Sequence, residues 1–209
     1  MGSHKRAFSP VLESLEGRCV PATIVVKNLN DGGPGSLRQA VLRSNSTPSV
    51  TDAVVFRPGL RGTIKLGSQI DITDDVRING PGAALLRISG QGATRVFNID
   101  DGAGVSSMKA RIEKLTLTRG HTPGDGGAIF NENDDVTLRG CTFAGNVADF
   151  YGGAYFDNGG ALTIVGCRFL GNSANNDSSG GAVYSTGALA VRRAISLSAS
   201  SVTTTATTA

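Results

Sequence analysis

Apolar and polar residues alternate along most of this chain in short segments, and each segment predicts a strand with one face turned inward. Gly, Asp or Asn separates neighbouring segments at short intervals, as tight turns require. Strands this short and this frequent are typical of a sandwich, a barrel or a solenoid. The predicted strands lie at residues 24–26, 54–56, 64–66, 70–72, 76–78, 85–88 and 96–99.

One segment near the N-terminus has helical periodicity instead. Apolar residues spaced i, i+3 and i+4 from Leu37 fall on one face of a helix predicted over residues 36–44. Ser36 and Gln39 have the spacing of a capping box, in which each side chain satisfies a free backbone donor at the helix start. Such a helix would cover the first rung of a solenoid and block edge-to-edge association of its strands.

A repeat of 26 residues decides among these folds. Residues 136–146 align with residues 162–172, and Thr, Gly, Cys, Phe, Gly and Asn recur at identical positions. Upstream, residues 126–130 align with residues 152–156 at the same offset. A coil of about 26 residues that holds short strands joined by turns is one rung of a parallel β-helix. The chain is therefore predicted to be all-β, a single right-handed parallel β-helix over residues 23–191 with a short N-terminal capping helix.

Equivalent residues of successive rungs lie about 4.8 Å apart, so identical side chains stack into ladders. The Phe ladder is expected to fill the core, and the Asn ladder to form hydrogen bonds from rung to rung. The Cys ladder is expected to point inward as small hydrophobic residues, and paired glycines are expected at sharp corners with positive φ. The ladders are Phe143 with Phe169, Asn146 with Asn172 and Cys141 with Cys167, and the corners are Gly126 with Gly127, Gly152 with Gly153 and Gly180 with Gly181.

Composition narrows the function classes. The formal net charge of +3 is small and scattered, which argues against a nucleic-acid partner. No apolar run approaches the roughly 18 residues that a membrane helix needs. Cys19, Cys141 and Cys167 give no closed disulfide framework, and two histidines make a zinc site unexpected. No cofactor is predicted.

Residues 1–22 and 192–209 are predicted to lie outside the solenoid. The first segment lacks the apolar region of a signal peptide, and its stretch from Leu12 to Arg18 resembles a Leu-Glu-x-Leu-Glu-x-Arg motif near the start of large secreted and surface proteins of some bacteria. The alternative is a charged, frayed terminus. The second segment is rich in Ser, Thr and Ala and is predicted to be disordered and dispensable for stability. A truncated or frameshifted reading frame is favoured over a natural linker as its origin.

Two short motifs recur together in the repeat region. Gly-Gly-Ala begins at residues 126, 152 and 180, and Phe-x-x-Asn begins at residues 143 and 169. This pair resembles the repeat of the polymorphic outer membrane protein family. The segment Gly-Ser-Leu-Arg-Gln-Ala-Val from residue 35 is also similar to a Ser-Leu-Arg-Glu-Ala-Ile motif of many bacterial β-helix surface proteins. The resemblance implies a surface-displayed protein associated with adhesion.

A catalytic hypothesis rests on Asp100, Asp101 and His121. Asp100-Asp101 and Gly120-His121 loosely resemble the Asp-Asp and Gly-His elements of pectin-hydrolase β-helices, and glycoside hydrolysis needs two carboxylates that flank the bond. The flanking Asn-Thr-Asp and Arg-Ile-Lys elements are absent. Neighbouring residues on a strand point to opposite faces, so only one of the two Asp residues would face a substrate. We expect all three residues to be turn and loop residues that do no chemistry.

Four acidic residues lie on predicted loops with asparagines nearby. Oxygen ligands at this density suit calcium. Their spacing matches neither the EF-hand loop nor the Gly-Gly-x-Gly-x-Asp repeat, and turn formation by Asp and Asn explains them equally well. No metal is predicted, and calcium stays an open alternative at Asp125, Glu132, Asp134 and Asp135.

The expected function is that of a non-enzymatic extracellular or cell-surface module of a bacterium. Its expected partner is a polysaccharide or another cell surface, with no nucleic acid and no transmembrane span. The alternative is a degenerate polysaccharide lyase or hydrolase. A carboxylate pair on one long groove, with a basic residue beside it, would distinguish the enzyme from the binding module.

Overall fold

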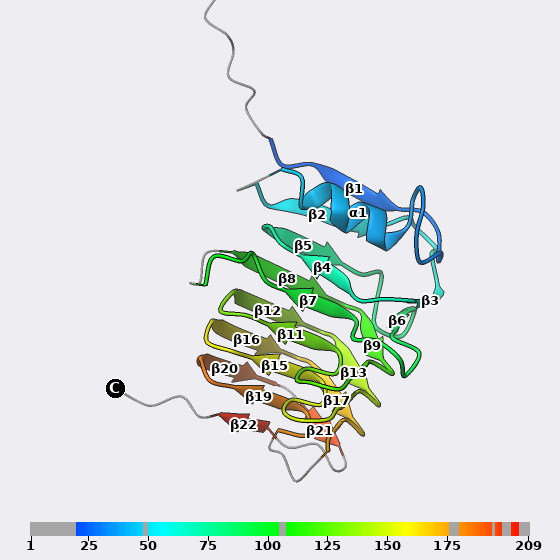
Figure 1. Ribbon diagram of the computed structural model, residues 1–209. Helices are drawn as coiled ribbons and strands as arrows, with labels where there is room; N and C mark the ends of the chain where they lie inside the picture. The colour runs from blue at the N-terminus through cyan, green and yellow to red at the C-terminus, as the bar shows by residue number, and fades with distance from the viewer. Residues whose placement is uncertain are drawn as a thin grey trace, which may run out of the picture.

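The protein is a right-handed parallel β-helix, as predicted (Figure 1). The computed structural model describes residues 20–47, 50–104, 108–175, 180–193, 195–197 and 202–204, and for 195–197, 202 and 204 it describes the backbone only. The N-terminal motif predicted within residues 1–22 therefore lies almost wholly outside the described residues.

Three long sheets and one short sheet run along the coil, and every strand pair is parallel. Sheet A contains β1 (Thr23–Val26), β2 (Asp52–Phe56), β5 (Val76–Asn79), β8 (Lys109–Glu113), β12 (Asp135–Arg139), β16 (Ala161–Val165) and β20 (Ala188–Arg192). Sheet B contains β3 (Gly62–Lys65), β6 (Leu86–Ser89), β9 (Thr116–Thr118), β13 (Thr142–Ala144), β17 (Arg168–Leu170) and β21 (Ile195–Leu197). Sheet C contains β4 (Ile70–Ile72), β7 (Phe97–Ile99), β11 (Ile129–Asn131), β15 (Tyr155–Asp157), β19 (Val183–Ser185) and β22 (Val202–Thr204). Sheet D contains β10 (His121–Thr122), β14 (Val147–Ala148) and β18 (Ser173–Ala174).

From β2 onward each rung visits sheets A, B and C in that order, and the rungs that contain β10, β14 and β18 pass through sheet D between B and C. The predicted period of 26 holds between β12 and β16, where Leu138 pairs with Ile164. Earlier rungs vary in length, because Val54 pairs with Ile78 and Ile78 with Ile112. The repeat is therefore visible in the sequence only in the later rungs.

Alternation within the strands builds the core. On sheet A the inward column is buried from β1 to β16, with every side chain at most 7% exposed, whereas Val191, which continues the column on β20, is 46% exposed. Because each inward residue stacks on its equivalent in the next rung, the columns of all three long sheets merge into one hydrophobic core. The sheet A column consists of Ile24, Val54, Ile78, Ile112, Leu138 and Ile164.

The helix α1 (Leu37–Ser44) covers the N-terminal end of this core (Figure 1). It packs against β1, β2 and β4 and buries Leu37, Ala40 and Val41. Ser36 accepts a hydrogen bond from the Gln39 backbone N–H at 3.1 Å, as the capping box predicts. The reciprocal half of the box is replaced, because the Ser36 N–H donates to the Gly33 carbonyl.

The tail differs from its predicted disorder. Within residues 192–209 the described backbone includes two strands, and β21 pairs with β17 while β22 pairs with β19. These backbone hydrogen bonds continue the coil past β20, where the sequence motif has ended. In the residues that the structure describes, no helix has the length and apolar character needed to cross a membrane.

Candidate functional site on the outer face of sheet C

The predicted ladders lie inside the coil. Phe143 and Phe169 pair in register, are at most 1% exposed and stack with ring centroids 5.0 Å apart. Asn146 and Asn172 are fully buried and joined by a side-chain hydrogen bond of 2.9 Å. These four side chains are structural, since none of them reaches the surface.

Cys141 and Cys167 are buried free thiols in adjacent rungs. A hydrogen bond with Cys167, together with burial, raises the pKa of Cys141. Both thiols lie in the hydrophobic core, away from solvent. This pair therefore packs as small apolar groups.

The glycine corners divide into two kinds of position. The first glycine of each pair has positive φ, at 69° for Gly126, 64° for Gly152 and 75° for Gly180. The second glycine is required for a different reason, because a Cβ on Gly127 would meet the carbonyl oxygens of Gly153 and Val147. Both kinds of position require glycine because of backbone geometry.

The outer face of sheet C carries a stack of aromatic rings. Phe130, Phe156 and Tyr184 occupy equivalent positions on β11, β15 and β19. Their ring centroids lie 5.3 and 5.6 Å apart, with interplanar angles of 15° and 1°. They point outward because their neighbours Ile129, Tyr155 and Val183 fill the core.

The loop before β15 adds the Tyr151 ring to this stack, and the neighbouring residue Phe150 is also exposed. Phe150 is 50% exposed and Tyr151 is 39% exposed. The Tyr151 ring lies 4.7 Å from the Tyr184 ring at a tilt of 32°, and its backbone N–H donates to Asp125 Oδ1 at 2.8 Å. We call Phe130, Phe150, Tyr151, Phe156 and Tyr184 the aromatic face.

Arg95 forms the border of the aromatic face toward the N-terminal rungs. Its guanidinium lies 5.1 Å from the centroid of the Phe130 ring. It donates to the carbonyls of Gly126 and Asp125 at 2.9 and 2.7 Å. Burial lowers its pKa, but an arginine keeps its proton at neutral pH in spite of such a shift. The aromatic face therefore has a fixed positive charge at one end.

Residues 166–186 match the model of the Chlamydia polymorphic membrane protein repeat. The match contains Phe169, Asn172 and the Gly180–Gly181 corner, and it also contains Tyr184 of the aromatic face. No curated protein matches the chain. This segment of the parallel β-helix, from Gly166 to Thr186, is therefore similar to the polymorphic membrane protein repeat.

The three catalytic candidates lie at two different corners of the coil. Asp100 and Asp101 follow β7, at the corner between sheets C and A, and accept hydrogen bonds from the backbone of Gly102 and Ala103. His121 begins β10, at the corner after sheet B. Its Nε2 lies 3.7 Å from Asp149 Oδ1, two residues before Tyr151. The structure therefore places His121 near Asp149 at the corner after sheet B, whereas the two aspartates act as turn residues at the corner after sheet C.

Each of the four calcium candidates accepts a hydrogen bond from a backbone N–H or a side-chain amide of another rung. In the described part of the chain, no group of three or more His, Cys, Asp and Glu residues could hold a metal ion. The observed hydrogen bonds run from Tyr151 N to Asp125, from Asn158 Nδ2 to Glu132, from Met108 N to Asp134 and from Ala161 N to Asp135.

A buried carboxylate that is paired with two arginines lies on sheet A. Glu113 is 3% exposed and accepts hydrogen bonds from Arg77 on one oxygen, at 2.9 and 3.1 Å, and from Arg111 on the other, at 2.7 and 2.9 Å. Burial alone would raise the pKa of Glu113, but the two arginines outweigh it and lower the pKa. With a single carboxylate held as an ion, this cluster has no second acid to serve as a proton donor.

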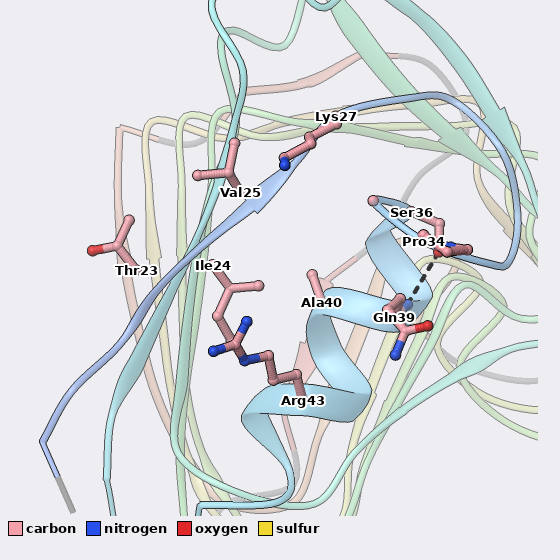
Figure 2. A pocket seen from close by; sticks show the side chains of 10 residues that line it. Thr23, Ile24, Val25, Lys27, Pro34, Ser36, Gln39, Ala40 and Arg43 are labelled. Carbon is pink, nitrogen blue, oxygen red and sulfur yellow. Dashed lines mark hydrogen bonds between the residues drawn. The ribbon is translucent and has the colours of Figure 1, made fainter.

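A cavity of about 420 Å³ lies between β1 and α1 (Figure 2). Its polar side chains come from Thr23, Lys27, Ser36, Gln39 and Arg43, and Figure 2 shows the hydrogen bond between Ser36 and Gln39 that caps the helix. None of its lining residues is acidic. The cavity therefore offers no acid and base pair for hydrolysis.

The aromatic face was not predicted from the sequence, although the alignment of the repeats contained a signal for it. The alignment of residues 126–130 with 152–156 brings Phe130 opposite Phe156. Alternation then puts both residues on the outer face, because Ile129 and Tyr155 occupy the core. Arg95 had no such signal, since it lies outside the aligned repeats.

Proposed function

We propose that this protein is a non-enzymatic cell-surface or extracellular module of a bacterium that binds polysaccharide through the aromatic face. The repeat of the polymorphic membrane protein type supports the surface location. An adhesin-like role follows if the bound polysaccharide belongs to another cell.

The outward aromatic stack is the observation that carries this proposal. Five of the chain's eight Phe and three Tyr residues lie in this one face. Phe150 and Tyr151 keep half and two fifths of their surface in water, which is costly for large apolar groups unless a partner covers them. Phe, Tyr and Arg are also the residues enriched where proteins contact partners.

A sugar suits this face better than a purely apolar partner. The C–H faces of a pyranose ring can pack on Phe150 and Tyr151, and the Tyr hydroxyl supplies a polar contact. Arg95 lies beside the Phe130 ring and can hydrogen-bond to a sugar hydroxyl.

The experiment replaces the two exposed rings, Phe150 and Tyr151, and leaves in place the stacked rings on the strands, of which Phe156 is buried and Phe130 and Tyr184 are partly buried. The Phe150→Ala/Tyr151→Ala variant should lose at least about tenfold in affinity for the polysaccharides that the wild type binds on an array of bacterial and host glycans. Its circular dichroism spectrum and Tm should stay close to those of the wild type. Leu42→Ala is the control, because Leu42 is equally exposed but lies on α1.

Two outcomes would overturn the proposal. One is unchanged glycan binding by the double variant. The other is release of reducing sugar by the wild type that Asp100→Ala/Asp101→Ala abolishes, which would favour the degenerate lyase or hydrolase. We expect Asp100→Ala/Asp101→Ala to bind glycans as the wild type does, because both residues serve turns at another corner.

A further inference from the structure

A second hollow lies on the outer face of sheet B, where the early rungs meet. Its volume is about 370 Å³. We call it the basic cleft, because three of its lining residues are cations and none is acidic. It is lined by Thr63, Lys65, Arg87, Ser89, Gln91, Thr118 and Arg119.

The three cations come from three successive rungs. Lys65 ends β3, Arg87 is on β6, and Arg119 directly follows β9. Since rungs are spaced by about 4.8 Å, the cleft presents roughly one positive charge per rung along the coil axis. Among the described residues, none of these three side chains takes part in an ion pair. Like charges on neighbouring rungs repel each other, and a bound anion would reduce this repulsion.

The backbone of the cleft is strained at two positions. Arg119 has φ of 50° and Gln91 has φ of 60°, in the left-handed region that L side chains rarely adopt. Thr118 pairs with Ala144, so the residue equivalent to Arg119 in the next rung is Gly145, with φ of 61°. A glycine would avoid this strain at position 119. Lys114 has a similar φ of 54° and is equivalent to Gly140 in the next rung, so the strain is a property of such corners and the three cations carry the proposal.

We propose that the basic cleft binds the sulfate or carboxylate groups of an acidic polysaccharide. Lys65, Arg87 and Arg119 would each contact an anionic group, and the Thr63 hydroxyl would donate to a sugar or acid oxygen. The site is separate from the aromatic face, because it lies on sheet B and in earlier rungs. The proposal for the basic cleft is therefore independent of the proposed function of the aromatic face.

The lining favours a polysaccharide over other polyanions. Single-stranded nucleic acids are held by aromatic side chains that stack on bases, and the cleft has none. Membrane-surface sites place apolar side chains beside their cations, and every side chain that lines this cleft is polar. A linear chain with charges at regular intervals fits one cation per rung.

The test uses the full chain and three ligands of defined chemistry. Heparin carries sulfate and carboxylate groups, polygalacturonate carries carboxylates only, and dextran is neutral. We expect salt-sensitive binding to heparin, to polygalacturonate or to both, and none to dextran. Lys65→Gln/Arg87→Gln/Arg119→Gln should lower the affinity for the bound polymer at least about tenfold.

The matched control removes the same number of charges elsewhere. Lys109→Gln/Arg139→Gln/Arg168→Gln changes three exposed cations outside the cleft and should retain most of the affinity. Equal losses in the two triple variants would overturn the proposal, because binding would then follow net charge alone. Binding to vesicles of phosphatidylglycerol but to neither acidic polymer would also overturn it.

The single substitution Arg119→Gly is expected to change both polymer affinity and Tm, whereas loss of charge alone would change only the affinity. Arg119→Gly should weaken polymer binding and at the same time raise Tm, because glycine relieves the left-handed backbone strain. Arg87→Gln removes the same charge from a strand with ordinary φ and should weaken binding without raising Tm. If Arg119→Gly binds as well as the wild type, Arg119 has no part in the site.

Discussion

Asn146 donates a hydrogen bond from Nδ2 to Asn172 Oδ1 at 2.9 Å, across two adjacent rungs. The same amide group donates to the Leu117 carbonyl at 3.1 Å and accepts from the Gly120 N–H at 2.8 Å. One fully buried side chain thus satisfies backbone groups of the preceding rung and a side chain of the next.

Asn146→Ala should therefore destabilise the fold by about 3 kcal/mol or more, because it leaves several buried polar groups without partners. Urea denaturation followed by circular dichroism measures the loss. Asn158→Ala is the control, because Asn158 is exposed and its hydrogen bond to Glu132 lies at the surface. The control should change stability by less than about 0.5 kcal/mol. A similar loss in both variants would mean that the inner ladder adds nothing beyond a surface contact.

The two kinds of glycine predict different costs for the same substitution. Gly127→Ala should destabilise by about 3 kcal/mol or more, because its Cβ would meet carbonyl oxygens of two neighbouring segments that cannot move apart. Gly145→Ala should cost only about 1–2 kcal/mol, because space is open around it and the strain comes from its φ of 61° alone. Thermal unfolding of both variants checks the order, and the reverse order would contradict the close-approach argument.

The regular part of the structure could be predicted because its repeat is exact in length. The alignment of Phe143 with Phe169 correctly fixes the register of sheet B, and the Ser36–Gln39 spacing correctly places the start of α1. Early strands were also predicted within a few residues, since alternation marks each one; β4 covers Ile70–Ile72 as expected.

Features that bridge rungs of unequal length could not be predicted. Arg77 and Glu113 lie far outside a 26-residue offset, so no repeat brings them together in the sequence. The strain at Arg119 is hidden for another reason, because an arginine aligned with Gly145 does not reveal its own φ. The strands β21 and β22 were missed because their pairing uses backbone groups, which a Ser- and Thr-rich segment supplies as well as any other.

The ionised form of Glu113 should stabilise the folded protein at neutral pH, and this stabilisation should be lost in acid. Its folded pKa is lowered below the ordinary value of 4.5, since the Arg111 and Arg77 hydrogen bonds outweigh burial. Its contribution is therefore present above the ordinary value and is lost as pH falls through the folded pKa. Glu113→Gln should cost about 1–3 kcal/mol at pH 7, and the gap from the wild type should narrow at about pH 3. Urea denaturation at both pH values measures the gap, and a constant gap would exclude the ionic origin.

Asp157 should have the opposite effect on stability, because its ionisation should destabilise the folded protein as pH rises. It is fully buried on sheet C, between Asn131 in the preceding rung and Ser185 in the next. Asn131 Nδ2 and Ser185 Oγ donate to it at 2.7 and 2.6 Å. Burial nevertheless raises its pKa above the ordinary value of 3.8. The folded state therefore holds its proton more tightly than the unfolded chain, and stability falls as pH rises from the ordinary value through the folded pKa.

Asp157→Asn should accordingly be more stable than the wild type at pH 7, and this gain should disappear below about pH 3.8. The amide can keep both contacts, accepting from Asn131 through Oδ1 and donating to Ser185 through Nδ2. Asp157→Ala separates charge from contact, since it removes both and should be less stable than Asp157→Asn at every pH. Thermal unfolding between about pH 3 and pH 8 measures all three proteins. A less stable Asp157→Asn at pH 7, with a gap that closes in acid, would mean that the ionised carboxylate stabilises the coil and that its burial is fully compensated.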